Sequence, residues 1–271
     1  MTKSQLPTFA KPPVVEVIVG VQFSALPNYS NALAGWYWKE FLDSAWSTAN
    51  EAPRLEDVVE SFEESTRWLQ KPPFIVSSGM ISERLLISNP STGRLIQVQN
   101  SRFILNWRLT ESDPTYPRYE VLSEEFIKQL ENFKRFVVAT GNPPLEINQW
   151  EVTYLNHVPK GELWNSAADW PNIFSYLQVP SGGVDGQVLD TFRGEWALAL
   201  RNQDGRLYVS LQHARINAPP FQEVVALQLT ARGSPKSSDL EIELEKGHRA
   251  IVLSFAEMTS TKAQEAWERT Q

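Results

Sequence analysis

The sequence predicts an α+β protein built from two similar halves, each with the order strand–helix–three strands–helix. Alternating apolar residues, typical of half-buried strands, give way repeatedly to the three- and four-residue spacings of helices. The stretches EVIVGVQFS (Glu16–Ser24) and EVTYLNHVP (Glu151–Pro159) both begin with Glu-Val, follow a Pro-Pro pair and precede an aromatic segment. We therefore expect an N-terminal half over residues 1–145 and a C-terminal half over residues 146–271, joined as one compact unit.

The elements of the first half follow from these patterns. After the strand at Glu16–Ser24, apolar spacing predicts a helix over Asn31–Trp46, and the acidic stretch Glu56–Leu69 is also predicted to be helical. Short alternating runs separated by Asn-Pro and Gly punctuation predict an antiparallel meander over residues 84–109. The clearest helix covers residues 119–141, where apolar residues recur every three or four positions and the closing glycine supplies the stop.

The second half is expected to repeat this order. A strand over residues 151–158 leads into an aromatic helix over residues 163–177, and an Asp-Gly turn then joins the two strands of a hairpin. A further strand follows the Pro-Pro pair at 219. Two closing helices are predicted over residues 240–258 and 261–270, with a cap between them.

Each half would pack helices across a curved antiparallel sheet. That arrangement is similar to TATA-binding-protein-like and helix-grip-like folds, and the analogy concerns the fold alone.

Composition excludes several classes of protein. The chain has 271 residues, a formal net charge of −7 and no cysteine, which rules out disulfides and thiol nucleophiles. The acidic balance disfavours a general affinity for nucleic acid. No apolar run is long enough to cross a bilayer, and the start lacks the apolar stretch of a secretory signal. We therefore expect a cytoplasmic protein with no membrane partner.

No motif predicts catalysis. The three histidines, His157, His213 and His248, share no short metal-ligand spacing, and there is neither a Gly-x-Ser-x-Gly elbow nor a Walker lysine. We assign no catalytic residue, metal site or cofactor, and favour a non-enzymatic protein.

Polar side chains within the strands are the candidate binding groups. Amide, guanidinium and hydroxyl groups on one face of a sheet can hydrogen-bond a ligand or a peptide backbone. The simpler alternative is an antiparallel sheet with one solvated face. The candidates for ligand binding are Gln97, Asn106, Arg108, Asn156, His157, Tyr208 and Gln212.

Several segments also carry a resemblance. KPPVVEVIVGVQF, LIQVQNSRFILNWR, VTYLNHVP and GHRAIVLSFAEMTSTKAQEAWER occur in this order along the chain. Together they resemble a sporadically distributed bacterial family of uncharacterised proteins, over the whole chain. The resemblance implies no reaction or cofactor. The patchy distribution of that family is compatible with phage-defence or toxin–immunity loci.

The leading hypothesis is an accessory component that binds another protein. It depends on the lack of a catalytic constellation, the richness in aromatic residues and the acidic helical surfaces. The alternative is single-stranded nucleic-acid binding on the sheet, with Trp107 or Tyr208 stacking on bases. The arginines that this alternative would use are Arg84, Arg94, Arg102, Arg108, Arg206 and Arg215. An unrecognised hydrolase is a third possibility.

Overall fold

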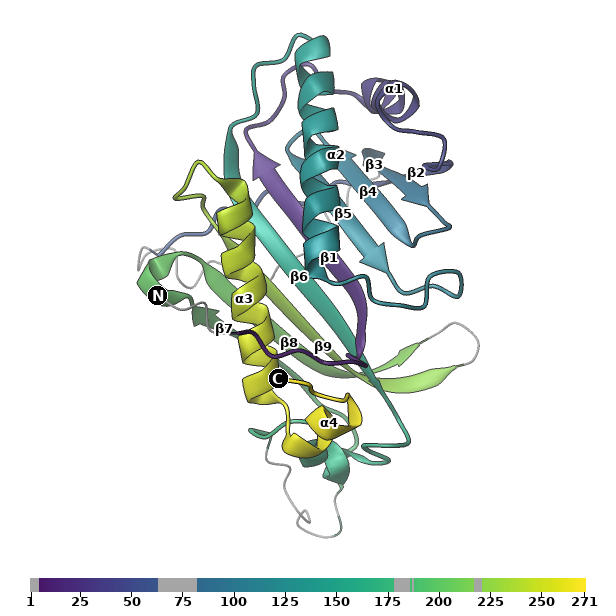
Figure 1. The fold of residues 1–271 in the computed structure, drawn as a ribbon, viewed down its shortest axis with the longest axis vertical. Coiled ribbons are helices and arrows are strands. Elements are labelled where there is room, and N and C mark those ends of the chain that lie inside the picture. Colours follow the sequence, from purple (N-terminus) through teal and green to yellow (C-terminus); the bar gives the residue numbers. More distant parts are fainter. Residues whose placement is uncertain (1–4, 63–81, 178–185, 187, 217–220) are drawn as a thin grey trace.

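The computed structural model describes residues 5–62, 82–177, 186, 188–216 and 221–271, and these form a mixed α+β structure. Nine strands make one antiparallel sheet in the order β2-β3-β4-β5-β1-β6-β9-β8-β7 (Figure 1). The strands are β1 (Val14–Phe23), β2 (Thr48–Pro53), β3 (Ser82–Asn89), β4 (Arg94–Gln99), β5 (Arg102–Arg108), β6 (Ile147–Pro159), β7 (Arg193–Ala199), β8 (Arg206–Ile216) and β9 (Gln222–Gly233). The helices are α1 (Asn31–Phe41), α2 (Tyr119–Ala139), α3 (Leu240–Met258) and α4 (Thr261–Ala266), with 3₁₀ turns η1 (Ala167–Asn172) and η3 (Arg201–Gln203).

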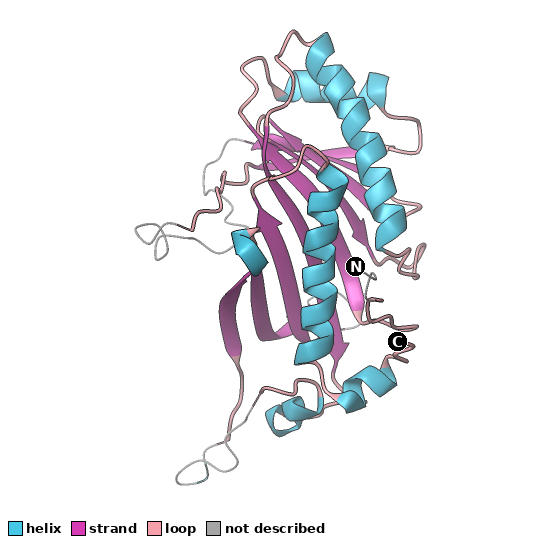
Figure 2. Ribbon diagram, turned by 60° about the vertical axis from the view of Figure 1, so that its left-hand side comes forward, coloured by secondary structure: helices cyan, strands magenta, loops and turns pink. Residues whose placement is uncertain are grey.

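The two long helices, α2 and α3, cover one face of this sheet (Figures 1 and 2). The centre of the sheet is the antiparallel pair of β1 and β6, in which Val19 lies opposite Val152 and Gln22 opposite Gln149. Helix α2 packs on β5 and β1, whereas α3 packs on β6 and β9. One continuous sheet therefore joins the two parts of the chain.

The structure contains one strand that was not predicted, and two predicted helices differ from it. An additional strand, β2, follows α1 because Thr48–Pro53 pairs with β3. The helix predicted over residues 163–177 is only the short 3₁₀ turn η1, which contains Pro171; proline lacks the N–H that a longer helix needs. Residues 56–62 form no helix, and the rest of the stretch predicted to be helical, residues 63–69, lies outside the described residues.

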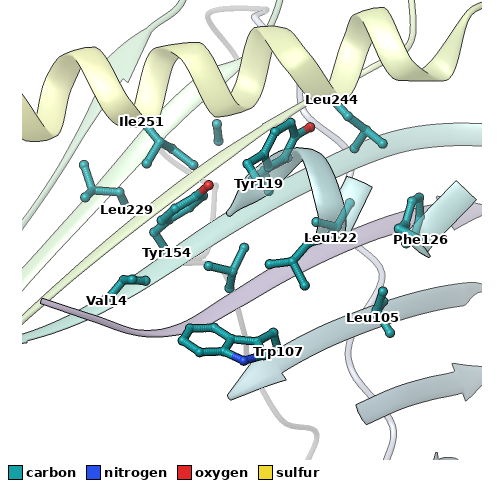
Figure 3. Packing of buried hydrophobic residues seen from close by; sticks show 14 of the residues in the cluster. Val14, Leu105, Trp107, Tyr119, Leu122, Phe126, Tyr154, Leu229, Leu244 and Ile251 are labelled. Carbon is teal, nitrogen blue, oxygen red and sulfur yellow. The ribbon is translucent and has the colours of Figure 1, made fainter. Parts of the chain in front are cut away.

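The hydrophobic core lies between the sheet and the long helices. Leu122 and Phe126 of α2 point toward Leu105 of β5, and Ile251 and Leu244 of α3 lie over the strands near Tyr154 (Figure 3). Alternation puts most of the buried apolar residues of the strands on this side. The second face is richer in polar residues, and it carries the candidate site.

The C-terminal elements are part of this core. The helical spacing of Ile251, Val252, Phe255 and Met258 predicts that α3 packs on the body of the protein. Ile251, Phe255 and Met258 are buried, and so is Trp267 after α4, whereas Val252 is half-buried. Phe9 from the N-terminal segment packs edge-on against Phe255, with ring centroids 5.4 Å apart. Ser260 caps α4 by accepting a hydrogen bond from the Ala263 N–H, which places a cap where the sequence predicted one.

His248 of α3 is a buried titratable group of the core. Its ring stacks on Tyr119 at 3.9 Å, and its Nδ1 lies 3.0 Å from the hydroxyl of Tyr154. Burial lowers the pKa of His248 to about 4. Because the unfolded chain then binds the proton more readily, the neutral histidine should stabilise the fold at neutral pH and lose that contribution in acid.

We expect this loss to develop as the pH falls from about 6.5, the ordinary value for histidine, toward about 4. Its full size should be roughly 3 kcal/mol, given about 1.4 kcal/mol for each pKa unit. Urea unfolding of the wild type and of His248→Phe at pH 7 and pH 4.5 measures it. Phe keeps the stacked ring and removes the titration, so the wild type should lose more stability than the variant. Equal losses in the two proteins would contradict this.

Candidate functional site on the polar face of the sheet

A row of polar side chains crosses four neighbouring strands on the sheet face opposite α2 and α3. Gln99 of β4 lies opposite Arg102 of β5, which lies opposite Gln22 of β1, which lies opposite Gln149 of β6. All four residues are buried. Because paired residues of an antiparallel sheet point to the same face, these side chains form one continuous polar row.

Residues 54–62, which we call the crossing segment, run over this row. The backbone N–H groups of Leu55, Val58 and Glu60 donate to the side-chain oxygens of Gln99, Gln22 and Gln149, at 3.0, 2.9 and 2.9 Å. Gln99 also donates from Nε2 to the Leu55 carbonyl at 2.9 Å, so its amide binds both the N–H and the C=O of Leu55. Three glutamines thus bind main-chain groups of a segment that is remote from them in sequence.

The crossing segment is almost fully extended. Gln99 and Gln149 stand three strand spacings apart, which is about 14 Å. The five residue steps from Leu55 to Glu60 can span at most about 17 Å. The sheet face therefore binds an extended chain that runs across the strands.

The acidic end of the segment is bound by two arginines and a tyrosine. Both Glu60 and Arg232 have side chains that are 1% exposed, and the Glu60 Oε2 accepts from Arg232 Nε at 2.8 Å. Arg206 pairs with Oε1 of the same carboxylate, and the Tyr208 hydroxyl donates to it at 2.9 Å. Burial raises the pKa of Tyr208, which keeps this hydroxyl protonated as a donor. Charge-assisted bonds of this kind are among the strongest in proteins.

The other end of the segment is bound through an apolar contact. Leu55 is buried in a small cluster with Ile18 of β1 and Ile104 of β5, separate from the main core. Arg102 adds a hydrogen bond from Nη2 to the Glu56 carbonyl at 2.7 Å. The site therefore combines an apolar anchor, a polar row and a carboxylate anchor.

Three predicted ligand-binding residues meet in a network beside this row. Gln97 Nε2 donates to Asn106 Oδ1 at 2.7 Å, and Arg108 Nε donates to Glu16 at 2.7 Å. Asn106 Nδ2 donates to the same Glu16 oxygen at 2.5 Å, and Arg84 donates to Gln97 at 2.8 Å. Gln97, Asn106 and Arg108 are thus connected, since Gln97 bonds Asn106 and both Asn106 and Arg108 donate to Glu16.

The other predicted residues are divided between the two faces. Tyr208 belongs to the carboxylate anchor, and Gln212 and His157 lie on the same face as it, by their strand register. Asn156 lies on the helix side instead, where its Nδ2 donates to the Leu227 carbonyl at 3.2 Å. Burial lowers the pKa of His157, which favours its neutral form.

The arginines of the nucleic-acid alternative are divided as well. Arg94 lies on the helix side and pairs with Glu125 of α2 at 2.8 Å, and Arg215 also lies on that side and stacks over Phe221. The other four share the polar face, where Arg206 and Arg108 pair with glutamates. The face therefore presents arginines whose charge is partly neutralised within the protein.

Sequence reasoning missed the central residues of the site. Gln22, Gln99 and Gln149 each lie near the end of a strand, at a position that alternation assigns to the polar face, in VQF, VQN and NQW. This recurrence of glutamine could have identified them as a group. No sequence pattern indicates that Glu60 and Arg232 pair, because they are separated by 172 positions. Their pairing depends on the crossing segment, whose path no local pattern describes.

Within the described residues, no group of three histidines, aspartates or glutamates is placed to hold a metal ion. No helix in the same residues is long and apolar enough to span a membrane. No protein-family model matches the chain, and no curated protein matches it.

Proposed function

We propose that this is a non-enzymatic protein-binding component, and that the polar face of its sheet binds an extended segment of a partner protein. The observation that carries the proposal is the hydrogen bonding of Gln99, Gln22 and Gln149 to main-chain N–H groups of the crossing segment. Main-chain recognition is tolerant of sequence, and it is a common basis of peptide binding. We place this binding in the cytoplasm, as the sequence leads us to expect.

Retention of a partner from a lysate of the source organism tests the proposal. On the polar face, Ser210→Arg introduces a bulky charge on β8, which should block docking. Val138→Arg is the matched control, because Val138 of α2 is 65% exposed on the helix side. We expect the immobilised wild type and Val138→Arg to retain a common protein that Ser210→Arg loses, with all three folded by circular dichroism. Loss with the helix-side variant alone would overturn the proposal.

Nucleic-acid binding remains the alternative, and we expect it to fail. Arg108 and Arg206 already pair with carboxylates, and a net charge of −7 should repel a polyanion. Fluorescence polarisation with short single-stranded DNA and RNA at physiological salt should show no submicromolar binding. A submicromolar affinity that falls steeply with salt would favour the alternative, because it reports released counterions.

We also infer that the chain arose by internal duplication. The inference is supported by the strand order, in which β5-β4-β3 extends from β1 on one side and β9-β8-β7 from β6 on the other. A long helix follows β5 and another follows β9, as in a TATA-binding-protein-like or helix-grip-like arrangement. Superposition of residues 14–139 on residues 147–258 tests it. From the family resemblance we also propose that the gene lies in a phage-defence or toxin–immunity locus. The identity of the neighbouring genes tests this.

A further inference from the structure

We propose that the crossing segment is an internal occupant of the partner site, and that the partner is an acidic extended segment that displaces it. The inference rests on the proposed function and names the chemistry of the ligand: an apolar residue followed five positions later by a glutamate. In the crossing segment these are Leu55 and Glu60.

The burial pattern of the segment defines this motif. Between Arg54 and Phe62 only the Leu55 and Glu60 side chains are buried, whereas Val59 is 63% exposed. Further contacts go to the backbone, through the three glutamines and Arg102. Two other side chains also contact the sheet: Asp57 accepts a hydrogen bond from the Ser101 hydroxyl at 2.6 Å, and Phe62 lies against Arg206. A competing chain therefore needs the two buried anchors at this spacing, whereas an exposed position such as Val59 is free to vary.

The arginines at the site require a carboxylate. Arg232 is 1% exposed, and a buried guanidinium without a counter-ion is strongly destabilising. Displacement of Glu60 by a neutral chain would leave Arg232 and Arg206 without that charge. A glutamate of the incoming chain would take the place of Glu60 in the ion pairs with Arg232 and Arg206. The exchange therefore keeps both ion pairs, and it favours acidic partners.

Charge complementarity supports the same ligand class. The crossing segment carries three acids, Glu56, Asp57 and Glu60, against the single base Arg54. The face beneath it contributes Arg102, Arg206 and Arg232, and the buried Glu151, opposite Arg232, offsets only part of this positive charge. The backbone pairing of β2 with β3 ends at Pro53, just before the crossing segment. Beyond that point, side chains of the strands bind the crossing segment. An intermolecular segment can take these side-chain bonds without disturbing the β2–β3 ladder.

A synthetic peptide, RLEDVVESF, tests exchange directly, since it copies residues 54–62. Full-length Leu55→Ala/Glu60→Gln weakens both internal anchors. We expect the fluorescently labelled peptide to bind this variant at least tenfold more tightly than the wild type, whose own segment competes. A peptide with the glutamate corresponding to Glu60 changed to glutamine should bind the variant at least tenfold more weakly than RLEDVVESF does.

A second variant covers the case in which the first fails to fold. Val58→Pro removes the N–H that donates to Gln22 and leaves both anchors and the arginine pairs in place. It should also bind the peptide more tightly than the wild type does. Equal peptide binding by folded Val58→Pro and wild type, or none by either, overturns the inference. The lysate experiment distinguishes this failure from that of the proposed function, because a partner lost only by Ser210→Arg would show that the face binds protein in another way.

Discussion

Replacing Glu60 with alanine should lower the free energy of unfolding by about 3–5 kcal/mol, the range measured when one partner of a buried ion pair is removed. The carboxylate bridges Arg232 and Arg206 and accepts a hydrogen bond from Tyr208, so its loss removes a buried charge that pairs with both guanidinium groups. Urea denaturation of wild type and Glu60→Ala at pH 7 measures the change. The effect is large against a typical total stability of 5–15 kcal/mol.

Two further variants show whether charge is responsible. Glu131→Ala removes a glutamate of α2 that pairs with Lys134 while 60% exposed, and it should cost less than 1 kcal/mol. Arg232→Met in the Glu60→Ala background removes the unpaired charge and should recover part of the lost stability, which a double-mutant cycle quantifies. A loss below 1 kcal/mol for Glu60→Ala would show that the carboxylate anchor contributes little to the fold.

The sequence predicted the elements whose residues repeat at a regular spacing. Helices α2 and α3 and the strands of the sheet other than β2 were expected because each carries its own apolar period, and the polar parity of β5 correctly put Asn106 and Arg108 on one face. Short elements were harder. The aromatic residues near Trp170 suggested a helix, but Pro171 lies inside the segment and only a 3₁₀ turn forms.

The candidate site could be predicted only in part, because it is assembled from distant residues. A strand's own alternation shows which side chains share a face, and so Gln97 and Tyr208 were identified. The crossing segment has no such period. Its acidic residues suggested a solvated helix, whereas in the structure Glu60 is buried against partners 146 and 172 positions away. Only the path of the chain reveals that contact.

Truncation after Lys246 should abolish cooperative folding, because it removes most of α3 and all of α4. Ile251, Phe255, Met258 and Trp267 would leave the core, and loss of a single large buried side chain typically costs 2–5 kcal/mol. Four such losses, about 8–20 kcal/mol together, match or exceed the roughly 5–15 kcal/mol stability of an ordinary domain. We expect aggregation or a non-cooperative thermal transition in calorimetry. A matched pair on α3 gives a graded measure: Ile251→Ala, at 1% exposure, should lose about 2–5 kcal/mol, whereas Leu253→Ala, at 39%, should lose clearly less. A truncated protein that melts cooperatively at the wild-type temperature would show that these helices contribute nothing essential to the core.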